Sequence, residues 1–71
     1  MTKLAGFSGK NIVKKLQKIG FVQLRQHGSH ARLFCEGRGF VTVPMHRELD
    51  AGFLRKIIKD ARLDTDEFLA L

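Results

Sequence analysis

The chain has 71 residues and a formal net charge of +6, from 13 Lys and Arg against 7 Asp and Glu. This length predicts one small domain over residues 1–71 that buries about 60% of its unfolded-state surface, and the lone Cys35 excludes a disulfide framework or a cysteine-based zinc cluster. No apolar run is long enough for a signal peptide or a membrane span, so we expect a soluble, cytoplasmic protein with no membrane partner.

The segment SGKNIVKKLQKIG, residues 8–20, predicts the first helix. Ser8 is a suitable N-cap, Gly20 suits the position just after the helix end, and the late lysines match the helix dipole. The apolar stripe consists of Ile12, Val13, Leu16 and Ile19. Three lysines recur every four residues on the far side: Lys10, Lys14 and Lys18. The helix is therefore amphipathic, with a basic face.

Three segments that alternate with period two follow: FVQLRQH, HARLFC and FVTV. Gly28-Ser29 and residues 36–39 provide the turns, and Pro44 ends the third strand because it lacks an N–H donor. This order predicts an antiparallel meander. One face is apolar and should meet the core: Val22, Leu24, Ala31, Leu33, Cys35, Val41 and Val43. The opposite face should carry Gln23, Arg25, His27, His30, Arg32, Phe34, Phe40 and Thr42.

The last third of the chain predicts two more helices. Asp50 can cap the first of them. Its apolar stripe consists of Leu54, Ile57, Ile58 and Ala61. The residues DTDE at 64–67 form a capping-box pattern before FLAL and predict a short terminal helix. The order α-β-β-β-α with a short extra C-terminal helix predicts an α+β fold, with a three-stranded antiparallel sheet and both main helices on one face.

The positive charge is concentrated in the first two thirds of the chain. Residues 1–47 hold nine Lys and Arg against one acidic residue, a balance of +8, whereas residues 48–71 hold four against six, a balance of −2. A basic body of this kind indicates a polyanionic partner, most simply nucleic acid, although a basic surface can also serve solubility alone.

His30 is the candidate catalytic residue. Alternation turns it away from the core, beside Arg32, at the end of a glycine-containing turn. An imidazole can accept a proton from an RNA 2′-hydroxyl or donate one to a departing 5′-oxygen, and nearby arginine or lysine can stabilise the phosphorane. The alternative is an ordinary histidine in a turn. The histidines follow no metal-ligand spacing and the acids lie mostly near the C-terminus, so we expect neither a metal nor another cofactor.

Other reactive or aromatic side chains have simpler explanations. Cys35 falls on the core face, and Ser29 is better explained as a turn residue than as a nucleophile. Phe34 and Phe40 fall on the opposite face. Packing against a partner protein or the terminal helix is the preferred explanation for them, and stacking on bases is the other.

These motifs resemble the HicA (YcfA-like) toxin family. The resemblance runs from about Ser8 to Leu63 and depends on the order of SGKNIVKKLQKIGF, GSH, VTVPMH and AGFLRKIIKDA, while LDTDEFLAL is similar to the tail of many members. The chain departs from the common pattern at Ala31, where many members have histidine or a large residue. It also departs at Phe53, where many have threonine.

The resemblance implies a fold similar to double-stranded-RNA-binding domains and a ribosome-independent mRNA interferase, the toxin of a type II toxin–antitoxin system. It implies a cognate HicB-type antitoxin that blocks the active site. The family's catalytic histidine corresponds to His30, and Gly28 and Ser29 match the rest of that motif. RNA contacts are then expected from the following side chains: Arg25, Arg32, Lys10, Lys14, Lys18 and His46.

The leading hypothesis is a metal-independent endoribonuclease that cleaves mRNA and is neutralised by its antitoxin. One alternative is a non-catalytic RNA-binding module of the same fold, in which His30 contacts a phosphate or a 2′-hydroxyl. Another is a protein-interaction domain whose basic face binds an acidic partner.

Overall fold

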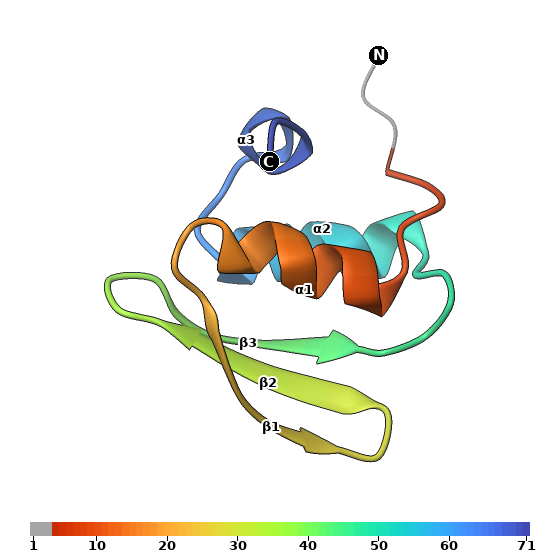
Figure 1. Ribbon diagram of the computed structural model, residues 1–71. Helices are drawn as coiled ribbons and strands as arrows, with labels where there is room; N and C mark the ends of the chain where they lie inside the picture. The colour runs from red at the N-terminus through yellow and green to blue at the C-terminus, as the bar shows by residue number, and fades with distance from the viewer. Residues whose placement is uncertain (1–3) are drawn as a thin grey trace.

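The computed structural model, which describes residues 4–71, has the predicted order of elements. They are α1 (Gly9–Gln17), β1 (Val22–His27), β2 (His30–Cys35), β3 (Gly39–Pro44), α2 (Ala51–Asp60) and α3 (Thr65–Leu69). The strands form one antiparallel sheet in the order β1-β2-β3. Figure 1 shows α1 and α2 on the same face of the sheet, as the sequence predicts. Among residues 4–71 no helix is long and apolar enough to cross a membrane.

Each helix begins at the predicted capping residue. The Ser8 side chain accepts a hydrogen bond from the Asn11 amide at 3.1 Å. Asp50 accepts from the Phe53 amide at 2.8 Å. The third cap is a complete capping box, consisting of reciprocal bonds between Asp64 and Glu67, both 2.8 Å long. These bonds satisfy amides that have no partner within the first turn of a helix.

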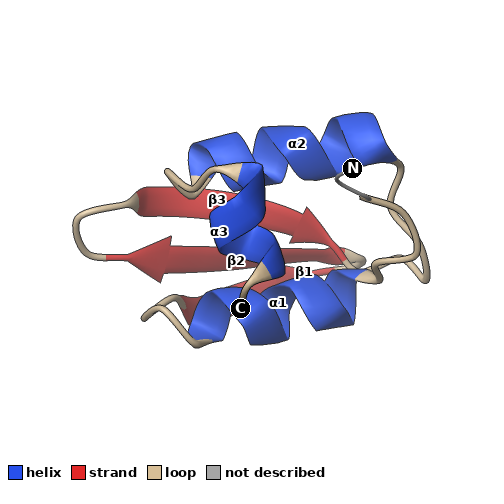
Figure 2. Cartoon of the chain, turned by 90° about the horizontal axis from the view of Figure 1, so that it is seen from above, coloured by secondary structure: helices blue, strands red, loops and turns tan. Residues whose placement is uncertain are grey.

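The core lies between the helices and the inner side of the sheet. The buried strand residues are Ala31, Leu33, Cys35, Val41 and Val43, as alternation predicts. The predicted stripes of α1 and α2 cover them. Viewed from above, α3 lies over the space between α1 and α2 (Figure 2), where the fully buried Phe68 packs edge-on to Phe7 at a centroid distance of 5.5 Å. Phe68 thus extends the core to the C-terminal helix.

The predicted core positions in β1 are wrong. Val22 and Leu24 are 59% and 55% exposed, and every residue of β1 is exposed. A register irregularity between Gln23 and Arg25 inserts an extra residue, so that Val22 pairs with Phe34 and shares its face. In addition, β1 is the sheet edge farthest from the helices, which pack against β3 (Figure 1). The side of the sheet turned away from α1 and α2 is here called the outer face, and no segment within residues 4–71 covers it (Figure 1).

The start of α1 packs directly on the segment that follows β3. The Gly9 amide donates to the His46 carbonyl at 2.9 Å. A Cβ atom at Gly9 would lie 2.7 Å from the Met45 Cα and 2.9 Å from the Pro44 carbonyl carbon. The Met45 amide in turn donates to the Ser29 carbonyl in the turn between β1 and β2. The absence of a side chain at Gly9 therefore allows three distant segments to meet.

Replacing Gly9 with alanine should destabilise the fold, because its Cβ would meet backbone atoms that cannot rotate away. We expect the free energy of unfolding to fall by about 1–3 kcal/mol, the usual cost of overpacking. That corresponds to a lower melting temperature by roughly 4–8 °C per kcal/mol, measured by circular dichroism.

Gly52→Ala in α2 is the matched control, because its Cβ would lie 3.3 Å from the capping oxygen Asp50 Oδ1 and would meet no backbone atom outside its own helix within 4 Å. Its melting temperature should change far less. Equal melting temperatures for Gly9→Ala and the wild type would contradict the proposed close packing.

Candidate active site

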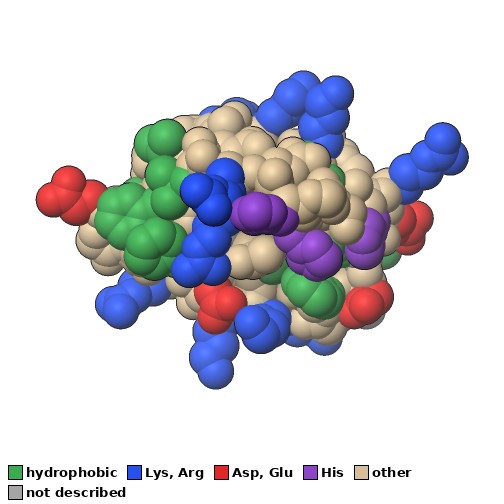
Figure 3. Space-filling view, turned by 90° about the horizontal axis from the view of Figure 1, so that it is seen from below, with side chains coloured by type: hydrophobic (Ala, Val, Ile, Leu, Met, Phe, Trp, Pro, Cys, Tyr) green, Lys and Arg blue, Asp and Glu red, His purple; other side chains and the backbone are tan. Residues whose placement is uncertain are grey.

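The outer face is organised in three rows that run across the strands, because directly paired residues share a face. The apolar row consists of Val22, Phe34 and Phe40. The arginine row consists of Arg25, Arg32 and Thr42. The histidine row consists of His27 and His30, with Pro44 opposite them on β3. In Figure 3, which views this face from below, apolar, basic and histidine side chains follow one another across the surface.

The GSH turn positions His30 at the first residue of β2. Gly28 has φ +56° and Ser29 lies outside the positive-φ region, the pattern of a two-residue type II′ hairpin turn with glycine first. This turn makes His27 and His30 a directly paired couple. The Ser29 carbonyl accepts the hydrogen bond from Met45 described above, so the turn is attached to the segment after β3.

His46, from the segment after β3, lies beside His30. The ring centroids are 6.4 Å apart and the rings are inclined by 67°, and both side chains are exposed. The His46 backbone is held by the Gly9 amide. Two imidazoles at this separation can serve one phosphodiester, one accepting the proton of the nucleophile and the other protonating the leaving oxygen. Such an arrangement would place a second group capable of proton transfer beside His30.

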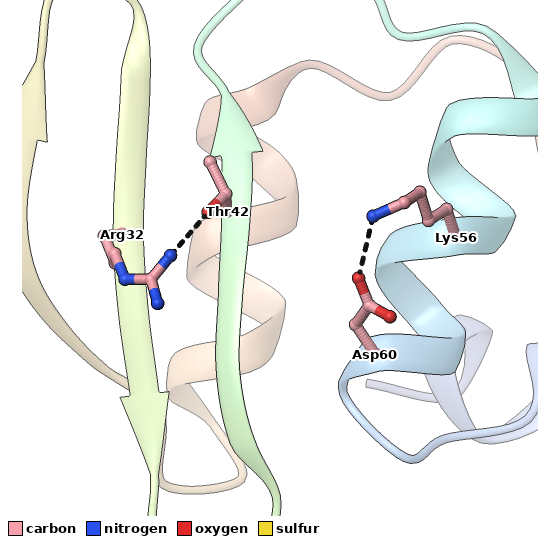
Figure 4. A network of polar contacts seen from close by, with 4 residues as sticks. All are labelled: Arg32, Thr42, Lys56 and Asp60. Atoms are coloured by element: carbon pink, nitrogen blue, oxygen red, sulfur yellow. Dashed lines mark hydrogen bonds and ion pairs between the residues drawn. The ribbon is translucent and has the colours of Figure 1, made fainter.

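The two arginines lie opposite each other at the centre of the outer face. Arg25 Nη1 lies 3.3 Å from His27 Nε2, which accepts because a guanidinium can only donate. Arg32 Nη1 donates to Thr42 Oγ1 at 3.2 Å (Figure 4), and its guanidinium lies 4.7 Å from the centroid of the Phe40 ring. Like charges in directly opposed positions repel, which favours an anion bound between them.

Neither of these arginines forms a salt bridge with a described acidic residue. The strands contain neither Asp nor Glu, and the one salt bridge within residues 4–71 joins Lys56 to Asp60 on α2 (Figure 4). The guanidinium groups therefore keep donors available for phosphate oxygens. A phosphate bound there would lie next to the histidine row.

The lysines of α1 lie apart from this surface. Lys10, Lys14 and Lys18 are exposed on the helix that covers the inner side of the sheet, and Lys18 Nζ donates to the Leu71 carbonyl at 2.9 Å. The structure thus brings His46, Arg25 and Arg32 of the predicted RNA-contact set together with His30, but not the three lysines.

The remaining reactive groups do not join the site. Cys35 is buried in the core, with Sγ 3.7 Å from the Ile19 carbonyl. No group of three or more His, Cys, Asp or Glu that could hold a metal ion occurs within residues 4–71. No pocket is found over the same residues, so the histidines stand on an open surface.

Sequence reasoning left His27, Val22 and Thr42 out of the candidate site. His27 could have been found, because a two-residue turn pairs it directly with His30. Thr42 follows from the same register as the partner of Arg32. Val22 could not have been assigned, since the irregularity that turns it to the outer face has no signal in the alternating pattern.

Comparison with known proteins gives one family. The family model described as the HicA toxin of bacterial toxin–antitoxin systems matches residues 9–63, well over half of the chain. This range includes the whole sheet, the GSH turn, His46 and both main helices. No curated protein matches the chain. The match and the fold agree with the resemblance seen in the motifs, and the chain belongs to the HicA toxin family of bacterial toxin–antitoxin systems.

Proposed function

We propose that this HicA-family protein is an endoribonuclease that cleaves mRNA in the cytoplasm, independently of the ribosome, and that it works through its own side chains. The observation that supports the proposal best is the juxtaposition of His30 and His46, with ring centroids 6.4 Å apart, on an open face beside two arginines. An open face suits a long polymer.

In the proposed reaction His30 is the general base. It removes the proton of a 2′-hydroxyl, and the 2′-oxygen attacks the adjacent phosphorus. As the bond between phosphorus and the 5′-oxygen breaks, His46 gives its proton to that oxygen. The products are a 2′,3′-cyclic phosphate and a free 5′-hydroxyl. The new bond from the 2′-oxygen to phosphorus replaces the broken bond to the 5′-oxygen, and His30 gains one proton while His46 loses one. Arg32 and Arg25 stabilise the extra negative charge on the phosphorane.

A toxin of this family has a cognate antitoxin as its partner. We infer that a HicB-type antitoxin neutralises the protein by covering the histidine row, because an open surface can be blocked only by a partner that lies on it. The basic arginine row suits acidic side chains on that partner.

Substituting either proposed proton-transfer residue should abolish most cleavage while leaving the fold intact. Both His30 and His46 are exposed, so His30→Ala and His46→Ala should melt like the wild type. Each should lower the rate of RNA cleavage by about 10²–10⁴-fold, the usual contribution of general acid–base catalysis. The measurement is the single-turnover cleavage rate of a labelled RNA, with growth after induction as the cellular counterpart.

His27→Ala is the matched control, because His27 lies in the same row but has no part in the proposed proton transfers. It should lose much less activity. Cleavage by His30→Ala at the wild-type rate would refute the mechanism, and RNA binding without cleavage by the wild type would favour the non-catalytic RNA-binding module.

Binding of RNA should depend on salt through the arginine row. Each phosphate contact on single-stranded RNA contributes about 0.7 to the slope of log affinity against log salt concentration. We therefore expect Arg25→Gln and Arg32→Gln each to reduce the slope by about that amount in a fluorescence anisotropy titration. Arg55→Gln, an equal charge change on an exposed residue of α2, should leave the slope unchanged. Equal slopes for all three variants would show that the RNA does not bind the arginine row.

A further inference from the structure

Most of the apolar row is exposed, and no described helix covers it (Figure 1). Val22 is 59% and Phe40 51% exposed, whereas Phe34 is half-buried. The rings of Phe34 and Phe40 lie with centroids 4.7 Å apart and planes tilted by 48°. Exposed apolar side chains that are contiguous rather than scattered mark an interaction surface. The core is closed elsewhere by α3, so these rings are not needed to complete it.

The chemistry next to the apolar row favours a nucleic acid over a protein segment. The adjacent row carries Arg25 and Arg32, and no acidic residue occurs in any of the three strands. Each nucleotide of an RNA brings an aromatic base and a phosphate together, which matches aromatic rings beside guanidinium groups. Arg32 already lies over one part of the Phe40 ring, at 4.7 Å from its centroid, in the kind of contact that arginine also makes with bases.

The spacing along β2 is suitable for a single RNA strand. His30, Arg32 and Phe34 point to the same face at every second residue, so the arginine lies about 7 Å and the phenylalanine about 13 Å from the histidine along the strand. A strand whose scissile phosphate lies between the histidine row and the arginine row can therefore place a nearby base on the apolar row.

We propose that Val22, Phe34 and Phe40 form a base-stacking subsite that selects single-stranded RNA. In a duplex the bases are already stacked on one another and cannot lie on a protein ring. The position of the subsite relative to the cleaved bond rests on the proposed function, whereas the stacking itself does not.

The absence of tryptophan and tyrosine from the chain allows a direct test. In a His30→Ala background, which prevents cleavage, Phe40→Trp introduces the sole strong fluorophore into the apolar row. Addition of a single-stranded oligoribonucleotide of mixed sequence should quench its fluorescence through base stacking. The matched control is Phe53→Trp in the same background, because Phe53 is 42% exposed but lies on α2. Its fluorescence should not change.

Affinity provides the second measurement. Loss of one stacked base weakens binding by about 5- to 150-fold, and we expect a change in that range for Phe40→Ala with the same oligonucleotide. Phe40→Leu keeps apolar area but has no ring, so it should recover little of the affinity. Phe53→Ala should bind like the parent. Circular dichroism melts of all variants separate these effects from unfolding.

The outcomes separate the subsite from the nuclease proposal. Quenching of Phe40→Trp and weakened RNA binding by Phe40→Ala support the subsite even if the wild type cuts no RNA. The absence of cleavage would refute only the nuclease proposal. Unchanged affinity of Phe40→Ala for RNA overturns the subsite and assigns the apolar row to a protein partner, whether or not the wild type cuts RNA. Equal quenching by the duplex form of the oligonucleotide overturns the selection for single strands. Failure of the His30→Ala parent to bind any RNA overturns the subsite, whereas cleavage by the wild type still decides the nuclease proposal.

Discussion

The close approach of α1 to the segment after β3 is the constraint on which the candidate site depends. At Gly9 a backbone without a side chain meets Pro44 and Met45, and its amide holds the His46 carbonyl. Met45 precedes His46, and its amide donates a hydrogen bond to the Ser29 carbonyl in the GSH turn. Through these backbone bonds a helix start, a hairpin turn and a loop fix two histidines that are far apart in sequence. Backbone bonds position side chains more rigidly than exposed ion pairs do.

The pairing of the strands then positions the side chains on the outer face. Antiparallel pairing aligns residues across three strands, so a single register produces an apolar row, an arginine row and a histidine row on one face. The irregularity in β1 contributes to this order, because it turns Val22 to the outer face next to Phe34. The helices lie on the other side of the sheet, and no described segment covers the face with the rows (Figure 1).

Most of the fold could be predicted from the sequence, because local rules determine it. Capping residues mark all three helix starts, and strict alternation in β2 and β3 correctly separates buried from exposed residues. Alternation failed in β1, where a bulge and an uncovered edge override the pattern. The approach of His46 to His30 could not be predicted, since it depends on a backbone contact at Gly9 that only the folded chain shows. Residues such as His30 were found because they lie in a tight turn, where sequence and geometry are closely linked.

We propose that RNA binds the outer face rather than the lysine-bearing helix. Nuclear magnetic resonance of labelled protein tests it most directly, with a single-stranded RNA whose 2′-hydroxyls are replaced by hydrogen to prevent cleavage. We predict shifts of the imidazole signals of His30 and His46 and of the Phe40 ring, with Lys14 and Phe53 unaffected. Shifts confined to α1, with unchanged imidazole signals, would contradict binding to the outer face and would show that RNA binds the helical side.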